Sequence, residues 1–284
     1  TCARPRCNAS DGLEGQCGGF SIGILKGDEK MKAILVAGGH GSRLYPFTRY
    51  THKTLLPLHR RPVIDYALAT IRRAGIKDIT IIGNRFIGQI AQHVGTGLPG
   101  ENIHYVIEEE PRGVDYALNL ARPHVEGSRI LVYFSDNITT IELTDAVTEF
   151  TASDSPPGCA LVGREVEDPE RFGVALFNED GSLKDIIEKP DVPPSNFAIG
   201  GIYLFDETFW ERLDRVVAEF GSRMSITDVN RTYVLEGGAS IIQSENSLWI
   251  DCGTPDALLE ASQLAAEGKL SPEPSNYRDG DATL

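Results

Sequence analysis

Short apolar runs alternate with amphipathic stretches through the first half of the chain. Residues 33–36 and 129–134 are mostly apolar, as expected of strands that are buried on both faces. A helical pattern spans residues 62–74, with Gly75 just past its end. Strands joined by helices in this way predict a mostly parallel sheet with helices on both faces. Further strands are predicted at 79–82 and 103–107, and further helices at 86–94 and 114–121.

Strand patterns are more frequent in the second half of the chain. Thr254 followed by Pro255 predicts the capped start of a last helix. No repeat or linker interrupts the pattern, so we expect one α/β domain over residues 31–270, with a Rossmann-like, mostly parallel mixed sheet and a strand-rich lobe. Strands are predicted at 160–163, Gly173–Phe177, up to Glu188, 198–205, 241–243 and 248–250, and helices at 207–217 and Ile226–Leu235.

A glycine-rich turn follows the first predicted strand and carries the strongest chemical signal. Its members are Ala37, Gly38, Gly39, Gly41, Ser42 and Arg43. Glycines let the backbone approach a ligand closely, and successive N–H groups in such a turn form a concave site for anions. Arg43 and the nearby Lys53 add fixed positive charge, so the segment suits a polyphosphate. The run is neither a Walker A loop nor a dinucleotide fingerprint, and a glycine-rich turn alone is often structural.

Two aspartates follow apolar runs at positions that suit a metal ion. Asp136 comes just after the run at 129–134, and Asp251 directly follows the run at 248–250. In open α/β sheets, ligands bind at the carboxyl ends of the strands. Because Mg²⁺ prefers one or two carboxylates together with substrate phosphates, this pair predicts a magnesium site. For either aspartate alone, a helix cap or a turn is the common structural alternative.

Charge and cysteine content narrow the class of protein. The formal net charge is −14, which disfavours non-specific nucleic-acid binding because that needs a basic face. No apolar run is long enough for a membrane span, and no secretory signal is evident. The five cysteines fit no disulfide framework or metal motif, which favours a reducing, cytoplasmic compartment. We expect residues 1–30 to be an extension or flexible tail and residues 271–284 a polar C-terminal tail.

Seven short motifs occur in a fixed order between residues 31 and 265. They are AGGHGSRLYPFT, HKTLLPL, FSDN, IIEKP, AIGGIYLFD, ITDVNRTY and LWIDCGT. In this set the chain resembles the sugar-1-phosphate nucleotidylyltransferases, most closely the short glucose-1-phosphate thymidylyltransferases. The resemblance implies the nucleotide-diphospho-sugar transferase fold, with the strand-rich lobe binding the sugar. It also implies an enzyme that condenses a nucleoside triphosphate with a sugar 1-phosphate to an NDP-sugar and pyrophosphate.

The resemblance also implies roles for individual residues. The implied catalytic set is Arg43, Lys53, Asp136 and Lys189, with Asp136 and Asp251 holding Mg²⁺. Glu188 would contact sugar hydroxyls and Lys189 the sugar phosphate. The remaining sugar-phosphate residues implied are Asn137, Gly200, Gly201 and Arg231, and a surface charge on a helix is the alternative for Arg231. No general base is required, because the attacking phosphate oxygen is already anionic.

The segment expected to contact the base departs from the thymidylyltransferase pattern. Close relatives carry a glutamine where this chain has Glu108, followed by Pro111 and Gly113. Glutamine offers both a donor and an acceptor, whereas a carboxylate only accepts and so suits the adjacent donors of guanine. The run EEEPRG also resembles mannose-1-phosphate guanylyltransferases. Thymidylyl and guanylyl transfer both stay open, and a solvated acidic turn is the structural alternative.

Other functions compete with this hypothesis. A catalytically silent relative could bind nucleotide-sugars and regulate a partner, yet the chain retains Arg43, Lys53, Asp136 and Asp251. A transferase for a cyclitol or alcohol phosphate would use a similar site. The expected partners are a nucleoside triphosphate and a sugar 1-phosphate, and a homo-oligomer, either a dimer or a tetramer, is also expected.

Overall fold

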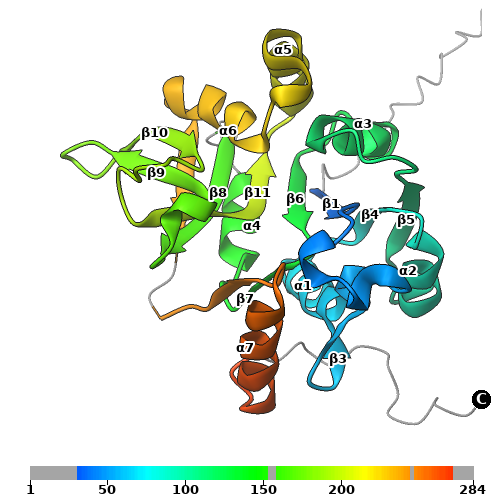
Figure 1. The fold of residues 1–284 in the computed structure, drawn as a ribbon. Coiled ribbons are helices and arrows are strands. Elements are labelled where there is room, and N and C mark those ends of the chain that lie inside the picture. The colour runs from blue at the N-terminus through cyan, green and yellow to red at the C-terminus, as the bar shows by residue number, and fades with distance from the viewer. Residues whose placement is uncertain (1–30, 153–157, 244–245, 271–284) are drawn as a thin grey trace, which may run out of the picture.

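A nine-stranded sheet forms the centre of the molecule (Figure 1). The computed structural model describes residues 31–152, 158–243 and 246–270, so the tails expected at 1–30 and 271–284 lie outside the described residues. The strands of the sheet are β1 (Lys32–Ala37), β4 (Asp78–Gly83), β5 (Asn102–Ile107), β6 (Ile130–Phe134), β8 (Cys159–Glu165), β9 (Gly173–Phe177), β10 (Leu183–Glu188), β11 (Phe197–Phe205) and β12 (Ala239–Ile242). Seven of them follow the order β10-β9-β11-β6-β1-β4-β5, and β8 lies between β11 and β12.

The two halves of the sheet differ in strand direction. Strands β6, β1, β4 and β5 are parallel to one another, as the alternation of strands and helices predicted. Strand β11 is antiparallel to β6, β8 and β9, and β10 is antiparallel to β9. The α/β fold with a mixed sheet and a strand-rich second half is therefore confirmed. Strand β11 joins the two halves, because it pairs with β6 as well as with β8 and β9.

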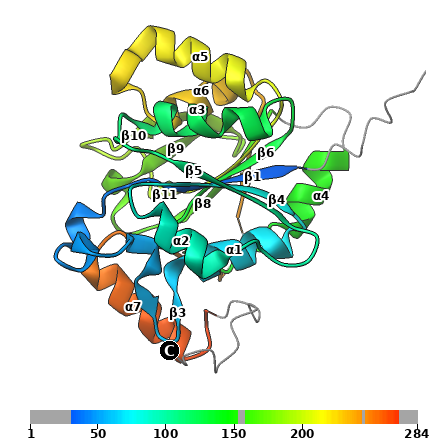
Figure 2. The same cartoon turned by 90° about the vertical axis from the view of Figure 1, so that its right-hand side faces the viewer.

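Helices cover both faces of the sheet (Figure 2). Along β1, Ala33 and Leu35 pack in one core with α1 and α2, whereas Ile34 and Val36 pack in another with α3, α5 and α6. Such alternation is the period of two that a strand imposes on its side chains. The helices are α1 (Val63–Arg73), α2 (Ile87–Val94), α3 (Val114–Val125), α4 (Thr144–Ala152), α5 (Phe209–Phe220), α6 (Ile226–Leu235) and α7 (Pro255–Ala266).

Helix α4 was not predicted, and two other helices end later than expected. The sequence of α4 is rich in threonine, which has low helix propensity, and only Val147 and Phe150 of this helix are buried. Helix α3 continues to Val125, and α5 runs from Phe209 to Phe220 rather than over 207–217. Packing against the sheet extends these helices beyond what the local pattern indicates. Within the described residues, no helix has the length and apolar character that crossing a bilayer requires.

A smaller layer joins helix α7 to the main sheet at the carboxyl end of β6. Here β7 (Asn137–Thr139) pairs antiparallel with β13 (Trp249–Asp251), and β2 (Pro57–Leu58) forms a hairpin with β3 (Arg61–Pro62). Ile138, Ile250 and Ala261 of α7 lie together in its core. The predicted cap is present, since Thr254 Oγ1 accepts from the N–H of Ala257 at 3.3 Å. This layer brings the end of β13 beside the end of β6.

Candidate active site

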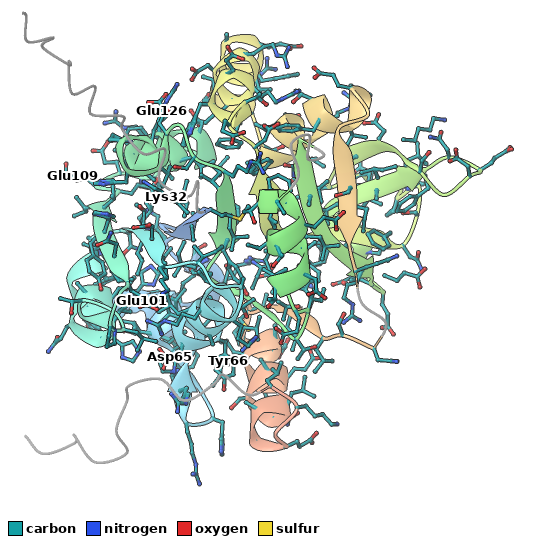
Figure 3. The ribbon with its side chains drawn as sticks, turned by 180° about the vertical axis from the view of Figure 1, so that it is seen from behind. Lys32, Asp65, Tyr66, Glu101, Glu109 and Glu126 are labelled. Carbon is teal, nitrogen blue, oxygen red and sulfur yellow. The ribbon has the colours of Figure 1, made fainter. Side chains whose placement is uncertain are left out.

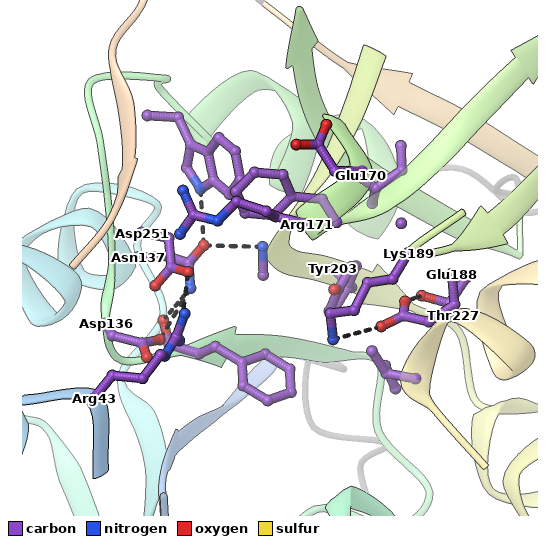
Figure 4. A pocket seen from close by; sticks show the side chains of 17 residues that line it. Arg43, Asp136, Asn137, Glu170, Arg171, Glu188, Lys189, Tyr203, Thr227 and Asp251 are labelled. Carbon is purple, nitrogen blue, oxygen red and sulfur yellow. Dashed lines mark hydrogen bonds and ion pairs between the residues drawn. The ribbon is translucent and has the colours of Figure 1, made fainter. Parts of the chain in front are cut away.

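A cleft of about 570 Å³ opens beside the carboxyl end of β6, between the parallel half of the sheet and the strand-rich lobe. Figure 4 shows charged side chains gathered at its two ends. We call one end, with Arg43, Asp136 and Asp251, the loop end, and include Lys53, which pairs with Asp136. We call the other, with Glu188, Lys189, Thr227 and Tyr203, the lobe end.

Strand pairing in the small layer places the two aspartates of the loop end. Asp251 lies opposite Asn137 in the antiparallel pair of β13 and β7. The N–H of Cys252 also donates to the backbone carbonyl of Asp136 at 2.8 Å. Two carboxylates separated by more than a hundred residues in the chain therefore meet in one cleft.

The two aspartates experience opposite electrostatic effects. Burial alone would raise the pKa of Asp136, but the ion pair with Lys53 holds that pKa below its usual value. Burial and the neighbouring charge of Asp136 raise the pKa of Asp251. A second carboxylate held beside an ionised one is a position where a cation would relieve repulsion.

Arg43 completes the loop end from the glycine-rich turn. It lies in the short 3₁₀ helix η1 (Ser42–Leu44), and its Nη2 is 4.0 Å from Asp251 Oδ2. Its side chain is 59% exposed, so most of its donors are open to the cleft. A Cβ atom on Gly253 would lie 2.5 Å from that guanidinium, so a side chain there would displace Arg43.

A buried histidine fixes Lys53 relative to the turn. His52 Nε2 contacts the carbonyl oxygen of Ala37, and its Nδ1 is 2.7 Å from Thr54 Oγ1. Burial lowers the pKa of His52 to about 4, so the ring is neutral near pH 7. His52 thus positions, as a neutral ring, the segment that carries Lys53.

Glu108 packs against the same turn from the end of β5, which lies two strands away from β1 in the sheet. Its side chain is almost fully buried, and a Cβ atom on Gly38 would overlap its carboxylate. Only glycine allows this close approach. Burial raises the pKa of Glu108, which excludes the solvated acidic turn for this residue, whereas Glu109 and Glu110 are exposed.

Hydrogen bonds hold the lobe end together. Thr227 Oγ1 donates to Glu188 Oε2 at 2.5 Å, and Lys189 Nζ is 2.9 Å from Glu188 Oε1. The backbone of Lys189 has φ +41°, a left-handed conformation that costs a non-glycine residue about 1–3 kcal/mol. The N–H of Lys189 donates to the carbonyl of Phe172 at 2.9 Å, which holds this turn in place.

Asn137 connects the two ends of the cleft. Its Oδ1 accepts from Trp249 Nε1 at 2.8 Å and from the N–H of Gly201 at 3.0 Å, while its Nδ2 donates to Asp136 at 3.1 Å. A Cβ atom on Gly201 would lie 2.6 Å from that amide nitrogen. The pairing of β11 with β8 shifts register between Ile199 and Tyr203, and this irregularity brings Gly201 to the cleft.

The donor set at the loop end fits Mg²⁺. Within the described ranges, no group of three or more His, Cys, Asp or Glu residues converges as a metal cage. Mg²⁺ takes one or two carboxylates and completes its shell with water and substrate phosphates, so Asp136 and Asp251 alone meet its needs. The raised pKa of Asp251 beside Asp136 is the observation that favours a cation there.

Seven of the residues identified from the sequence line the cleft, whereas Lys53, Glu108 and the glycine-rich turn before Arg43 are not part of its lining. Its lining includes Arg43, Asp136, Asn137, Glu188, Lys189, Gly201 and Asp251. Arg231 does not join them, because its guanidinium lies on the surface of α6 and pairs with Asp185 at 2.7 and 2.9 Å. That position matches the surface charge considered as its alternative. Gly200 packs against Trp249, and neither Pro111 nor Gly113 belongs to the lining.

Several cleft residues were not identified from the sequence. Thr227 and Tyr203 lie within motifs that were recognised, but only the folded arrangement shows that they face the lobe end. Arg171 extends over the ring of Phe172, with 5.4 Å between the guanidinium carbon and the ring centroid, and both line the cleft. No spacing signal links these two residues to Glu188. Trp249 is buried, and its ring nitrogen donates to Asn137.

Comparison with known proteins assigns the family. Residues 32–268 match the Nucleotidyl transferase family. A glucose-1-phosphate thymidylyltransferase from Xanthomonas campestris is 36% identical over 237 residues, covering 82% of this chain and 80% of the relative. The low-salt glycan biosynthesis nucleotidyltransferase Agl11 from Haloferax volcanii is 34% identical over 256 residues, covering 89% of this chain and 71% of that protein.

Solved structures agree with this assignment. A Bacillus anthracis protein assigned provisionally as a glucose-1-phosphate thymidylyltransferase, solved with sucrose, superposes with a TM-score of 0.76 at 35% identity, covering 83% of this chain and 95% of that one. A UDP-glucose pyrophosphorylase complexed with UDP-glucose shares the fold, with a TM-score of 0.72 at 22% identity over 84% of this chain and 99% of its own. The chain therefore belongs to the nucleotidyl transferase family and, within it, to the sugar-1-phosphate nucleotidylyltransferases.

Proposed function

We propose that this enzyme transfers the thymidylyl group of dTTP to a glucose-1-phosphate-like substrate in the cleft between the loop end and the lobe end. Condensation of a nucleoside triphosphate with a sugar 1-phosphate is the reaction of its family. The names of its relatives support dTTP and glucose 1-phosphate as the specific pair. The observation that carries the proposal is the meeting of Arg43, Lys53, Asp136 and Asp251 at one end of a single cleft.

The charged residues at the two ends of the cleft would contact different substrates. Arg43 and Lys53 would neutralise the triphosphate, and Lys189 would bind the phosphate of the sugar. Glu188 would accept hydrogen bonds from sugar hydroxyls, since Thr227 already fixes its other oxygen. Lys189 is 63% exposed, which leaves its ammonium group available to a ligand. Such positioning converts a bimolecular reaction into an effectively unimolecular one.

The chemical step needs charge neutralisation more than proton transfer. An anionic oxygen of the sugar phosphate attacks the α-phosphorus, a new P–O bond forms, and the bond to the β-phosphate oxygen breaks. Pyrophosphate leaves with the electron pair of that bond. Mg²⁺ held by Asp136 and Asp251 would supply Lewis-acid stabilisation of the charge on the phosphoryl oxygens. Arg43 and Lys53 would stabilise the same charge with preorganised donors.

Guanylyl transfer is the second candidate, and Glu108 is the residue that favours it. An ionised Glu108 accepts but does not donate, which matches the adjacent N–H donors of guanine. Its burial against Gly38 places it beside the turn that would hold the triphosphate.

A pyrophosphate-release screen tests the function directly. Purified protein is assayed with dTTP, UTP, GTP, CTP and ATP against a panel of sugar 1-phosphates, with MgCl₂ or with EDTA. We expect the highest kcat/KM with dTTP and a glucose-1-phosphate-like partner, and no turnover with EDTA. If all five nucleotides gave turnover with a cyclitol phosphate and none gave turnover with a sugar 1-phosphate, the sugar assignment would be contradicted. Undiminished turnover in EDTA would contradict the metal assignment.

A further inference from the structure

Side chains from outside the glycine-rich turn hold its carbonyl groups. Asn84 follows β4, and its Nδ2 donates to the carbonyl oxygen of Gly39 at 3.2 Å. Thr48 lies in the 3₁₀ helix η2 (Phe47–Arg49), and its Oγ1 donates to the carbonyl oxygen of Gly41 at 2.9 Å. Both polar side chains are buried. Because a buried polar group that loses its partner is costly, these hydrogen bonds fix the backbone of the turn.

His52 holds a third carbonyl from another segment. It directly precedes the 3₁₀ helix η3 (Lys53–Leu55), and its Nε2 contacts the carbonyl oxygen of Ala37. Its Nδ1 accepts from the N–H of Thr54 at 3.2 Å, so the proton of the neutral ring lies on Nε2 and is donated to that carbonyl. Side chains therefore hold the carbonyl of every second residue from 37 to 41.

Holding a carbonyl group also sets the direction of the next N–H group. The C=O of one residue and the N–H of the next belong to one planar trans peptide and point in opposite directions. The hydrogen bond from Asn84 to Gly39 therefore directs the N–H of His40 away from Asn84. Over the described ranges, the N–H groups of Gly39 and His40 meet no backbone or side-chain acceptor, and both residues are exposed. These two donors are open to an anionic ligand.

The residues that hold the turn are themselves fixed. Asn84 Oδ1 accepts from the N–H of Phe86 at 2.9 Å, and because a backbone N–H can only donate, the amide must turn its Nδ2 toward Gly39. The segment of His52 is tied to α2, since the N–H of His52 donates to Gln89 Oε1 at 3.1 Å. The contacts to the turn therefore come from positions with little freedom to move.

We propose that Asn84, Thr48 and His52 are positioning residues that preorganise the turn for a triphosphate. This rests on the proposed function, because it takes the turn to bind the phosphates. None of the three side chains lines the cleft, so they act through the backbone of the turn. A loop without such contacts would lose conformational entropy on binding and would turn carbonyl oxygens toward the anion. Donors that are already directed need no reorganisation when charge develops on the phosphates.

Calorimetric titration with tripolyphosphate in MgCl₂ tests the proposal with a probe that has neither base nor sugar. Thr48→Val keeps the shape of the side chain and removes its hydroxyl. The affinity should fall by about tenfold, the value of one hydrogen bond that holds a binding conformation. Thr48→Ser restores the hydroxyl and should recover most of the affinity. Asn84→Ser keeps an oxygen near Phe86, is too short to reach Gly39, and should also lose about tenfold.

Thr70→Val is the matched control for removing a buried hydroxyl. Thr70 Oγ1 donates to the carbonyl oxygen of Tyr66 within α1 at 3.1 Å, and Figure 3 labels Tyr66. Thr70 is buried, as Thr48 is, but it holds no carbonyl of the turn. Thr70→Val should therefore bind tripolyphosphate as the wild type does. A loss equal to that of Thr48→Val would show that lower stability, and not the turn, reduces the affinity.

Initial rates separate positioning from general damage to the cleft. They are measured with the nucleotide and the phosphorylated acceptor that give the fastest turnover. In Thr48→Val and Asn84→Ser, kcat/KM for the nucleotide should fall by about tenfold, while KM for the acceptor stays at the wild-type value. An equal rise in KM for both substrates would contradict a positioning role.

Three binding results would overturn the proposal. One is wild-type affinity for tripolyphosphate in both Thr48→Val and Asn84→Ser. Another is an equal loss in Thr48→Val and Thr48→Ser, because side-chain volume and not the hydroxyl would then matter. The third is a wild-type protein that does not bind tripolyphosphate. Preference for another base or acceptor would refute the thymidylyl assignment alone, because the probe carries neither group.

Discussion

The loop end and the lobe end of the cleft hold their charged groups by different means. At the loop end, Asp251 lies beside the like charge of Asp136 and is partly buried, so its ionised form is disfavoured. At the lobe end, Glu188 is satisfied by the hydroxyl of Thr227 and the ammonium of Lys189. The loop end therefore suits a cation that binds together with the substrate phosphates. The lobe end is arranged for shape and hydrogen bonding.

This difference predicts that loop-end variants lose turnover, whereas lobe-end variants lose affinity for one substrate. It also predicts that removing a negative charge stabilises the fold when the charge lies at the loop end, and not when it lies at the lobe end. Active sites commonly sacrifice stability in this way.

The largest expected effect is that of Asp251→Asn. Turnover should fall by at least about a thousandfold, because one of the two carboxylates proposed to hold Mg²⁺ is lost. Tm should nevertheless rise near pH 7, because the raised pKa of Asp251 means that its ionised form destabilises the folded state. A gain of about 1 kcal/mol would raise Tm by roughly 2–4 °C in a chain of this size.

The sign of that stability effect can be checked by lowering the pH. Protonation of wild-type Asp251 removes the destabilising charge, so the difference in Tm between the two proteins should shrink as the pH falls through its raised pKa. Asp256→Asn is the matched control. It removes a favourable charge from the first turn of α7, so Tm should fall slightly and turnover should not change. A lower Tm for Asp251→Asn than for the wild type at neutral pH would show that repulsion between Asp136 and Asp251 does not destabilise the fold.

Lys53→Met should reduce kcat/KM by about a hundredfold, since one preorganised cation leaves the loop end. Lys53 lowers the pKa of both Asp136 and Asp251. Its removal should therefore move the acid limb of the pH profile to higher pH. Lys77→Met, at an exposed position, serves as the control and should keep the wild-type profile. An unshifted acid limb would mean that these carboxylates do not set the pH dependence.

Thr227→Val sharpens the comparison at the lobe end. Glu188 would lose the hydroxyl that orients it, so KM for the sugar 1-phosphate should rise by about tenfold while kcat changes little. Thr232→Val is the control, because Thr232 lies on the same helix and donates to the carbonyl of Val229 away from the cleft. A fall in kcat with an unchanged KM would place Thr227 in the chemical step instead.

Local pattern predicted the parallel half of the sheet and the loop end. The run before Ala37, the glycines after it and the aspartates at strand ends all act within a few residues, so the sequence alone reveals them. The pairing of Asp251 with Asn137 was beyond reach, because it joins segments far apart in the chain. Helix α4 was missed because its stability comes from packing rather than from its threonine-rich sequence.

Arg231 shows why the lobe end was harder to predict. Its place in the motif ITDVNRTY suggested a sugar-phosphate ligand. Helix α6 packs along β10, where Thr227 meets Glu188 in the cleft. Arg231 lies one turn further along α6 and pairs with Asp185, which is not part of the cleft lining. Residues four positions apart share one face of a helix and differ in their position along its axis. That position relative to the cleft depends on how the helix packs, which the local pattern does not give.

The smallest expected effect concerns Glu108, which belongs to neither end and packs behind the turn of the loop end. Because burial raises its pKa, part of Glu108 becomes a neutral carboxylic acid as the pH falls, and that form can donate and accept as glutamine does. The wild-type preference for dTTP over GTP, measured as the ratio of kcat/KM values, should therefore increase toward acid pH. Glu108→Gln should favour dTTP at every pH, by about tenfold or less, the value of one hydrogen bond. Glu109→Gln changes the exposed neighbour and should leave the ratio and its pH dependence as in the wild type. If Glu108→Gln also left both unchanged, Glu108 would be a packing residue of the turn, and other residues would select the base.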